Sequence, residues 1–223
     1  MHVLLSGIVG STAYGLAHAG SDLDRLGLFA APTVAFHGLH RPTESHVTTA
    51  PDRTLHEAAK WCRLALGGNP TAAELAWLPE ELYEVRTPLG EELIAIRSSF
   101  LSAGAVRNSY LGYAGQQFRK LTARDTADPR GRAKAAKNAR HLVRLVRQGV
   151  HLHETGRLEI RLPDPDGVRE LGERYAEHPQ EAAALLADAE HRLARPGVLP
   201  DAPDERPVED WLRRVRAAHL PTA

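Results

Sequence analysis

The stretch Gly10-Ser11-Thr12-Ala13-Tyr14-Gly15 is followed closely by Ser21-Asp22-Leu23-Asp24-Arg25-Leu26-Gly27, and these two segments decide the fold of the N-terminal half. An apolar run from Val3 to Val9 precedes the first segment, and a largely apolar run from Asp22 to Ala31 contains most of the second. Short runs of this kind, bounded by glycines and by a proline, are typical of strands. The pattern therefore predicts two strands joined through a turn of small residues.

The two aspartates give this predicted strand pair a possible chemistry. Asp22 and Asp24 are two residues apart, so on a strand their side chains would share one face while Leu23 points the other way into the core. Two carboxylates on one face bind hard cations such as Mg²⁺. Gly10 lets the backbone approach a ligand closely, and Ser11 offers a hydroxyl and an amide for phosphate oxygens. We expect a phosphate-binding turn opposite a metal site, as in enzymes in which two metals about 4 Å apart hold the attacking and leaving oxygens.

The composition is that of an ordinary globular protein. The chain has 223 residues, a formal net charge of zero, 43% hydrophobic residues and 25% charged residues, which argues against a disordered or fibrous protein. The opening run MHVLLSGIVG lacks a basic segment and predicts a buried strand rather than a signal peptide, so we expect a cytoplasmic protein with no membrane partner. The single cysteine, Cys62, excludes an intramolecular disulfide and a multi-cysteine zinc site.

The remaining sequence predicts an α+β protein, with a small mixed sheet in the N-terminal half and a mostly helical C-terminal lobe. Ser45–Glu57 is a candidate third strand, and the helical patterns begin at Ala58. We expect helices at 58–66, 71–77, 89–96, 100–121, 130–153, 168–177, 179–193 and 208–220. The expected domains are a catalytic domain at 1–98 and a helical lobe at 99–223.

The predicted helix at 130–153 has one apolar stripe and one basic face. The stripe follows helical spacing and consists of Ala139, Leu142, Val143, Val146 and Val150. The expected opposite face consists of Lys134, Lys137, His141, Arg144 and Gln148. Between Arg107 and Arg161 there are thirteen Lys and Arg residues against four acids, which suggests a surface for phosphates.

The segments quoted at the start resemble the signature of the DNA polymerase beta-type nucleotidyltransferase superfamily, in which Gly-Ser precedes an Asp-x-Asp pair by about ten residues. The longer strings SGIVGSTAYGLAHAGSDLDRLGLFAAP and LHEAAKWCRLALGGNPTAAELAWL are similar to a narrower bacterial and phage branch associated with RNA repair. This resemblance extends over residues 1 to about 160. It implies that Asp22 and Asp24 bind the metals, and that Gly10 and Ser11 contact the triphosphate.

The same resemblance implies a third carboxylate on a neighbouring strand, as catalytic base or metal ligand. Glu57 ends the third candidate strand and is the first choice, Asp52 is the second, and Glu57 could instead begin the following helix. The resemblance also implies that the basic helix presents Lys134, Lys137 and His141 to the β- and γ-phosphates. A solvated basic face is the alternative for these three residues.

These observations predict a magnesium-dependent nucleotidyltransferase that uses two Mg²⁺ ions, for which Mn²⁺ could substitute. It would transfer a nucleoside monophosphate from a triphosphate such as ATP to an acceptor hydroxyl. An RNA end, a small molecule and a protein side chain are all open as acceptors, and the oligomeric state is not readable. The alternative function is a nucleotide-binding or interaction module that has lost turnover.

Two other signals are set aside. Gly10 to Gly15 fits the spacing of a P-loop, but Leu16-Ala17 replaces its Lys-Ser/Thr pair. His56-Glu57 matches half of a zinc-deaminase signature, and the Pro-Cys-x-x-Cys half is missing.

Overall fold

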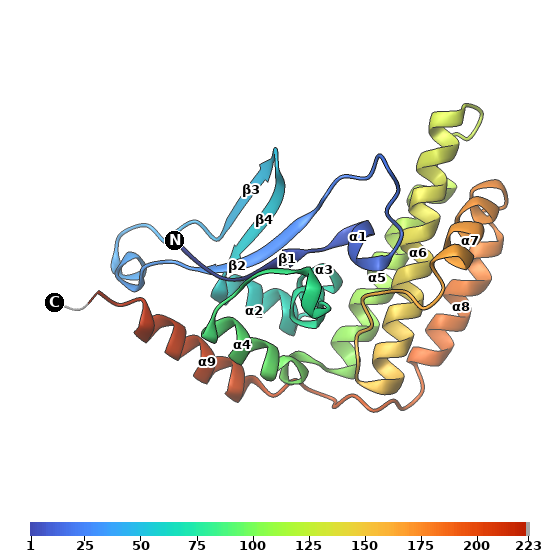
Figure 1. The fold of residues 1–223 in the computed structure, drawn as a ribbon. Helices are drawn as coiled ribbons and strands as arrows, with labels where there is room; N and C mark the ends of the chain where they lie inside the picture. Colours follow the sequence, from blue (N-terminus) through green and yellow to red (C-terminus); the bar gives the residue numbers. More distant parts are fainter. Residues whose placement is uncertain (222–223) are drawn as a thin grey trace. The chain divides into compact units, whose positions relative to one another are not determined.

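The computed structural model describes residues 1–221 and has the expected α+β architecture, with a mixed sheet and a helical C-terminal region (Figure 1). Contacts divide the chain into two compact units. Unit 1 comprises residues 1–101 together with 203–223, and unit 2 comprises 102–202. These divisions come from contacts alone, so the expected catalytic domain at 1–98 and helical lobe at 99–223 stay a prediction.

Unit 1 is built on one five-stranded sheet with the order β3-β4-β2-β1-β5. β2 and β4 are parallel, whereas the other neighbouring strands are antiparallel. The strands are β1 (His2–Ile8), β2 (Arg25–Ala30), β3 (Ser45–Thr49), β4 (Asp52–Glu57) and β5 (Tyr83–Arg86). The predicted single strand over 45–57 is a hairpin, because the chain turns at Ala50-Pro51 and β3 pairs back on β4.

The helices of unit 1 lie mainly on one side of this sheet (Figure 1). They are α1 (Gly10–Tyr14), α2 (Ala58–Leu66), α3 (Pro70–Glu74), α4 (Pro88–Ala95) and α9 (Glu205–Ala218), with 3₁₀ turns at Thr33–His37, Leu75–Trp77, Glu80–Leu82 and Arg97–Phe100. The core includes Leu5, Leu28 and Leu55, each at most 1% exposed. α9 is fixed to α4 by the buried Trp211, whose Nε1 donates to the Leu89 carbonyl at 2.8 Å.

Unit 2 is an antiparallel pair of long helices covered by two shorter ones. Its helices are α5 (Ala103–Thr122), α6 (Pro129–Thr155), α7 (Pro165–Glu177) and α8 (Glu181–Leu193). α5 and α6 approach closely at Gly149, where a Cβ would lie 2.7 Å from the side chain of Tyr110. The predicted apolar stripe of α6 is confirmed, because each of its five residues is buried.

One part of the predicted basic face of α6 is wrong. Arg144 and Gln148 are buried, at 5% and 3% exposure. The Arg144 guanidinium donates to Gln148 Oε1 at 2.8 Å, and Gln148 Nε2 donates to the Glu159 carbonyl at 2.8 Å. The segment after α6 therefore covers this face, and helical spacing alone does not reveal such a covering.

Candidate functional site

The Gly10 turn lies directly against the carboxylate of Asp24. The backbone N–H of Val9 donates to the Asp24 carbonyl at 3.0 Å, and Gly10 has φ +70°. A Cβ at Gly10 would lie 2.1 Å from Asp24 Oδ2. Only glycine meets both the backbone and the space requirement, so the fold brings the turn and one of the two aspartates together.

Asp22, Leu23 and Asp24 do not lie on a strand, contrary to the prediction. Pairing with β1 begins at Arg25, opposite Ile8, and residues 21–24 form a loop. Asp22 is exposed, and Leu23 is 38% exposed rather than buried in the core. The alternation of strand side chains therefore does not determine where Asp22 points.

A cavity of about 240 Å³ opens beside the Gly10 turn in unit 1. Its polar lining comes from Tyr14, Asp24, Arg25, Asp52, Thr54, His56, Thr71 and Glu74. β2 and β4 run parallel with Arg25 opposite Arg53, so Asp24 and Asp52 stand at neighbouring positions where the two strands begin. Among the predicted site residues the cavity lining includes Gly10, Asp24 and Asp52, whereas Ser11 and Asp22 lie outside it.

Glu57 is positioned differently from Asp52. Side chains alternate along β4, and Glu57 has the opposite parity from Asp52, Thr54 and His56. It is 2% exposed. Its Oε1 accepts from Arg216 at 2.6 Å, and its Oε2 caps α2 by accepting from the Ala59 amide at 2.8 Å. Both carboxylate oxygens of Glu57 thus have structural partners, and the residue is not part of the cavity lining.

Two cavity residues, Glu74 and Tyr14, were missed from the sequence. Glu74 is 1% exposed at the end of α3, and the Tyr14 hydroxyl lies 2.7 Å from each of its carboxylate oxygens. This contact connects α3 to α1, the short helix that begins at Gly10 and ends at Tyr14. An acid inside the apolar run AAELAWL was the available signal, because a buried carboxylate needs a specific partner.

His56 is another cavity residue that the sequence analysis did not assign to the site. Its Nδ1 lies 2.8 Å from Ser45 Oγ, which also accepts from Lys60 Nζ at 2.8 Å. Burial, followed by the nearby charge of Lys60, lowers the pKa of His56 from its ordinary value. The ring is therefore neutral at pH 7.

The cavity offers oxygen ligands of the kind that Mg²⁺ prefers. Within residues 1–221 no group of three or more His, Cys, Asp or Glu side chains is arranged to hold a metal. Magnesium in phosphate-transfer sites is commonly bound by only one or two carboxylates, with phosphate and water completing the shell. Asp24 and Asp52 fit this donor set.

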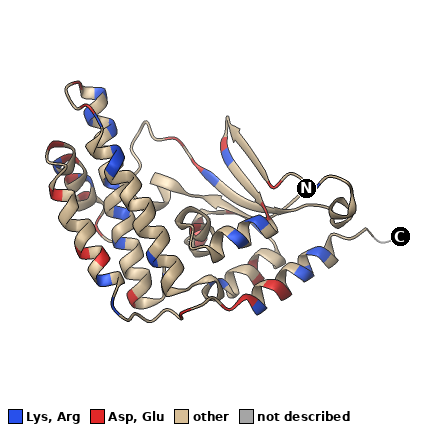
Figure 2. Cartoon of the chain, turned by 180° about the vertical axis from the view of Figure 1, so that it is seen from behind, with Lys and Arg blue, Asp and Glu red and all other residues tan. Residues whose placement is uncertain are grey.

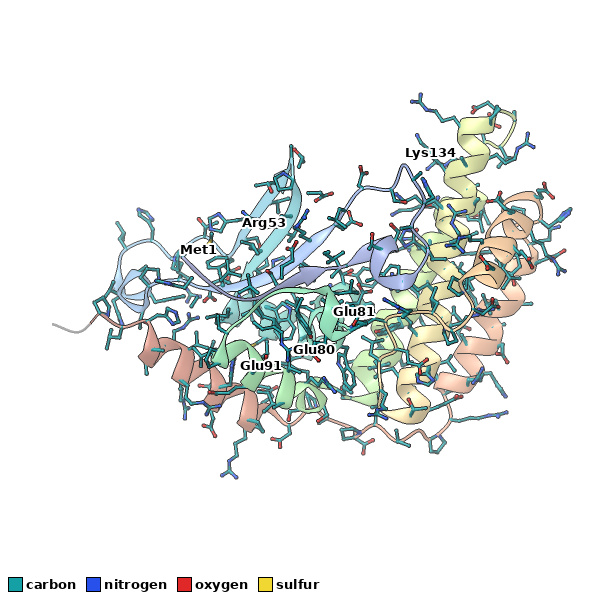
Figure 3. The ribbon with its side chains drawn as sticks, in the orientation of Figure 1. Met1, Arg53, Glu80, Glu81, Glu91 and Lys134 are labelled. Carbon is teal, nitrogen blue, oxygen red and sulfur yellow. The ribbon has the colours of Figure 1, made fainter. Side chains whose placement is uncertain are left out.

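The three residues expected on the basic helix lie in unit 2. Lys134 and Lys137 are exposed on α6, and Figure 3 shows the Lys134 side chain projecting from the helix. Burial, followed by Arg144, Lys137, Arg140 and Lys120, lowers the pKa of His141 to about 4. His141 is therefore neutral at pH 7 and could contact a phosphate only as a hydrogen-bonding group. Phosphate binding by these residues stays a prediction.

A comparison with protein-family models assigns most of the chain to a known family. The family model RlaP, described as the RNA repair pathway DNA polymerase beta family, matches residues 1–193. No curated protein matches the chain. The family suggests a nucleotidyltransferase role in RNA repair. No helix within residues 1–221 is long and apolar enough to cross a membrane.

Proposed function

The chain belongs to the RNA repair pathway DNA polymerase beta family, and from this premise we propose that it transfers a nucleoside monophosphate from a nucleoside triphosphate to an acceptor hydroxyl. The acceptor oxygen attacks the α-phosphorus, the bond from that phosphorus to the pyrophosphate oxygen breaks, and the hydroxyl proton passes to a base or to water. Pyrophosphate is released. The main support is the contact of the Gly10 turn with Asp24 at a cavity that Asp52 also lines.

Asp24 and Asp52 are the carboxylates that we propose for Mg²⁺, or Mn²⁺, with Asp22 near enough in sequence to contribute from the preceding loop. A bound divalent cation would supply positive charge to the phosphate oxygens as pyrophosphate leaves. Asp52 takes the place that the sequence offered first to Glu57, because Glu57 has its carboxylate oxygens on Arg216 and on the cap of α2. Gly10 and Ser11 would orient the triphosphate from the turn.

We propose an RNA end as the acceptor, because unit 2 carries a concentrated positive charge. The basic tip consists of seven exposed side chains at the end of α5 and the start of α6, namely Arg119, Lys120, Arg124, Arg130, Arg132, Lys134 and Lys137. None of the seven forms an ion pair with any acid in the described part of the chain, 1–221. Blue segments at this end of the helix pair are visible in Figure 2.

The acids within the basic tip do not offset this charge through ion pairs. Asp125 accepts from the Ala127 amide at 2.9 Å, and Asp128 caps α6 by accepting from the Gly131 amide at 2.8 Å. Elsewhere arginines are paired, for example Arg86, which contacts Glu80 at 3.0 Å and also bonds Glu91. Uncompensated cations at this density favour a polyanion, since each neutralised phosphate releases counterions.

The test is pyrophosphate release with Mg²⁺ and each of four nucleoside triphosphates, in the presence and absence of a mixed RNA pool. Asp24→Asn and Asp52→Asn should each lower release by about a hundredfold or more, because each removes a charge at the reacting phosphate. Asp201→Asn, an exposed acid outside the cavity, is the matched control and should keep the wild-type rate.

The outcomes separate the proposal from its alternative. RNA-dependent release that requires both aspartates supports the transferase and its acceptor class. Triphosphate binding without release under any condition would instead favour a binding module of the same fold. Normal rates in both aspartate variants would refute the assignment of the carboxylates.

A further inference from the structure

Three polar side chains from three elements form one hydrogen-bonded chain beside the cavity. Lys60 on α2 donates from Nζ to Ser45 Oγ at 2.8 Å, and Ser45 Oγ lies 2.8 Å from His56 Nδ1. Ser45 on β3 is the register partner of His56 on β4, so the antiparallel hairpin places these two side chains opposite each other. All three residues are half-buried.

The donors and acceptors of these three side chains fix the direction of the hydrogen bonds between them. An ammonium group has no acceptor, so Lys60 must donate to Ser45. Ser45 has one O–H, which can donate to Nδ1 only if that nitrogen carries no proton. The opposite arrangement, with Nδ1–H donating, would direct two donors at Ser45 Oγ and leave the serine O–H without an acceptor among the partners found in residues 1–221. The favoured tautomer therefore carries its proton on Nε2.

The second nitrogen of His56 is the one available to a ligand. Nδ1 makes the hydrogen bond with Ser45, and the ring forms no other within the described chain, 1–221. His56 lines the same cavity as Asp24, Asp52 and Glu74. The carboxylates of this lining can only accept hydrogen bonds when ionised, so an Nε2–H group adds a neutral nitrogen donor for a ligand oxygen, beside the hydroxyl groups of Thr54 and Thr71.

We propose that His56 binds the nucleotide as a hydrogen-bond donor through Nε2–H to one of its oxygen atoms, and that Ser45 and Lys60 are positioning residues that hold this tautomer. The inference deepens the proposed function and rests on it for the identity of the ligand. It also excludes His56 as the base for the acceptor hydroxyl, because a protonated Nε2 cannot take a proton. The lowered pKa of His56 agrees with a neutral ring in the ligand-free chain.

The first experiment reads the tautomer directly in the full-length, ligand-free chain. Long-range ¹H–¹⁵N spectra of protein labelled with ¹⁵N-histidine distinguish an Nε2–H ring from an Nδ1–H ring and from imidazolium. Wild type and Ser45→Thr, which keeps the hydroxyl, should show Nε2–H at His56, whereas Ser45→Ala should show a mixture of both tautomers. Nδ1–H or imidazolium in the wild type at pH 7 would overturn the inference.

The second experiment measures triphosphate affinity by calorimetry with ATP and Mg²⁺. His56→Ala should weaken binding about three- to tenfold, the range for one lost hydrogen bond. His56→Gln should recover part of that affinity because the Gln Nε2 amide can donate from a similar reach. His40→Ala, an exposed histidine outside the cavity, is the control. Equal affinity in wild type and His56→Ala, or no difference between the Gln and Ala variants, would contradict the role.

Failure of the two proposals can be told apart. An Nε2–H tautomer with the expected affinity pattern, but no pyrophosphate release, would remove the transferase function and leave the nucleotide contact standing. Normal release with an Nδ1–H ring would remove only the role of His56.

Discussion

Replacement of Glu57 by Gln removes one charge from a buried ion pair and tests whether this residue acts in stability or in catalysis. The Glu57 side chain is 3% exposed and that of Arg216 is 21% exposed, with 2.6 Å between Oε1 and Nη1. The Arg216 guanidinium also lies 4.0 Å from the centre of the Phe36 ring. The pair therefore fixes α9 to the start of α2 and to the segment after β2.

The magnitude follows from the charge left behind. Breaking a buried pair by removing one partner costs about 3–5 kcal/mol, because the remaining charge has no compensation. Since Gln can still cap α2 and accept a hydrogen bond from Arg216, we expect the lower end for Glu57→Gln, about 3 kcal/mol. Glu57→Ala should cost about 1 kcal/mol more, the usual value for a lost cap. The double variant Glu57→Gln/Arg216→Met should be less destabilised than the sum of the single changes.

Urea unfolding followed by tryptophan fluorescence is the appropriate assay. The chain has three tryptophans, Trp61, Trp77 and Trp211, and all belong to unit 1, so the signal reports the unit that contains the pair. Glu92→Gln is the matched control, because Glu92 also pairs with α9, through Arg214 at 2.8 Å, but on the surface. Its effect should stay within about 1 kcal/mol.

The refuting result is specific. In the absence of urea, where Glu57→Gln remains folded, this variant should release pyrophosphate near the wild-type rate, whereas Asp52→Asn should lose release. Unchanged stability together with lost release in Glu57→Gln would instead make Glu57 the third carboxylate, as the sequence first suggested, and would remove Asp52 from that role.

Three further outcomes are expected. Gly10→Ala should lower both pyrophosphate release and the urea midpoint, since its Cβ would meet the Asp24 carboxylate at a backbone with φ +70°; wild-type values for both would contradict the turn geometry. The folded pKa of His141, about 4, lies below its unfolded value of about 6.5. Between these pH values the unfolded chain therefore binds more protons than the folded chain. The contribution of His141 to the free energy of unfolding is complete above pH 6.5 and is lost, by up to about 3 kcal/mol, as the pH falls towards 4. NMR titration of the ring, compared across this range with the urea midpoint of His141→Gln, checks the sign; this unfolding is followed by circular dichroism, because His141 lies in unit 2 and the tryptophans lie in unit 1. Lys134→Glu/Lys137→Glu should weaken RNA binding and reduce its dependence on log salt by at least about one unit; an unchanged slope would exclude the basic tip as an RNA surface.

The sequence by itself determined the elements whose causes are local. Glycines and apolar runs specified β1, the Gly10 turn and β2, and helical periodicity specified α6 with its stripe from Ala139 to Val150. These features depend on the conformational freedom of the backbone and on the burial of one face of a strand or helix. Both are determined by residues that are close together in the sequence. The pairing of a small-residue turn with nearby carboxylates was readable for the same reason, although only Asp24 of the Asp22-Leu23-Asp24 segment lines the cavity.

Tertiary structure decided which distant side chains meet. Asp52 rather than Glu57 lines the cavity because parallel pairing of β4 with β2 aligns Asp52 with Asp24, while Arg216, 159 residues along the chain from Glu57, fixes that carboxylate elsewhere. The contact of Tyr14 with Glu74 joins residues on different elements. The hydrogen bonds that link Lys60, Ser45 and His56 do the same. Such contacts depend on strand register and helix packing, which are set by the whole fold and not by the spacing of residues in one segment.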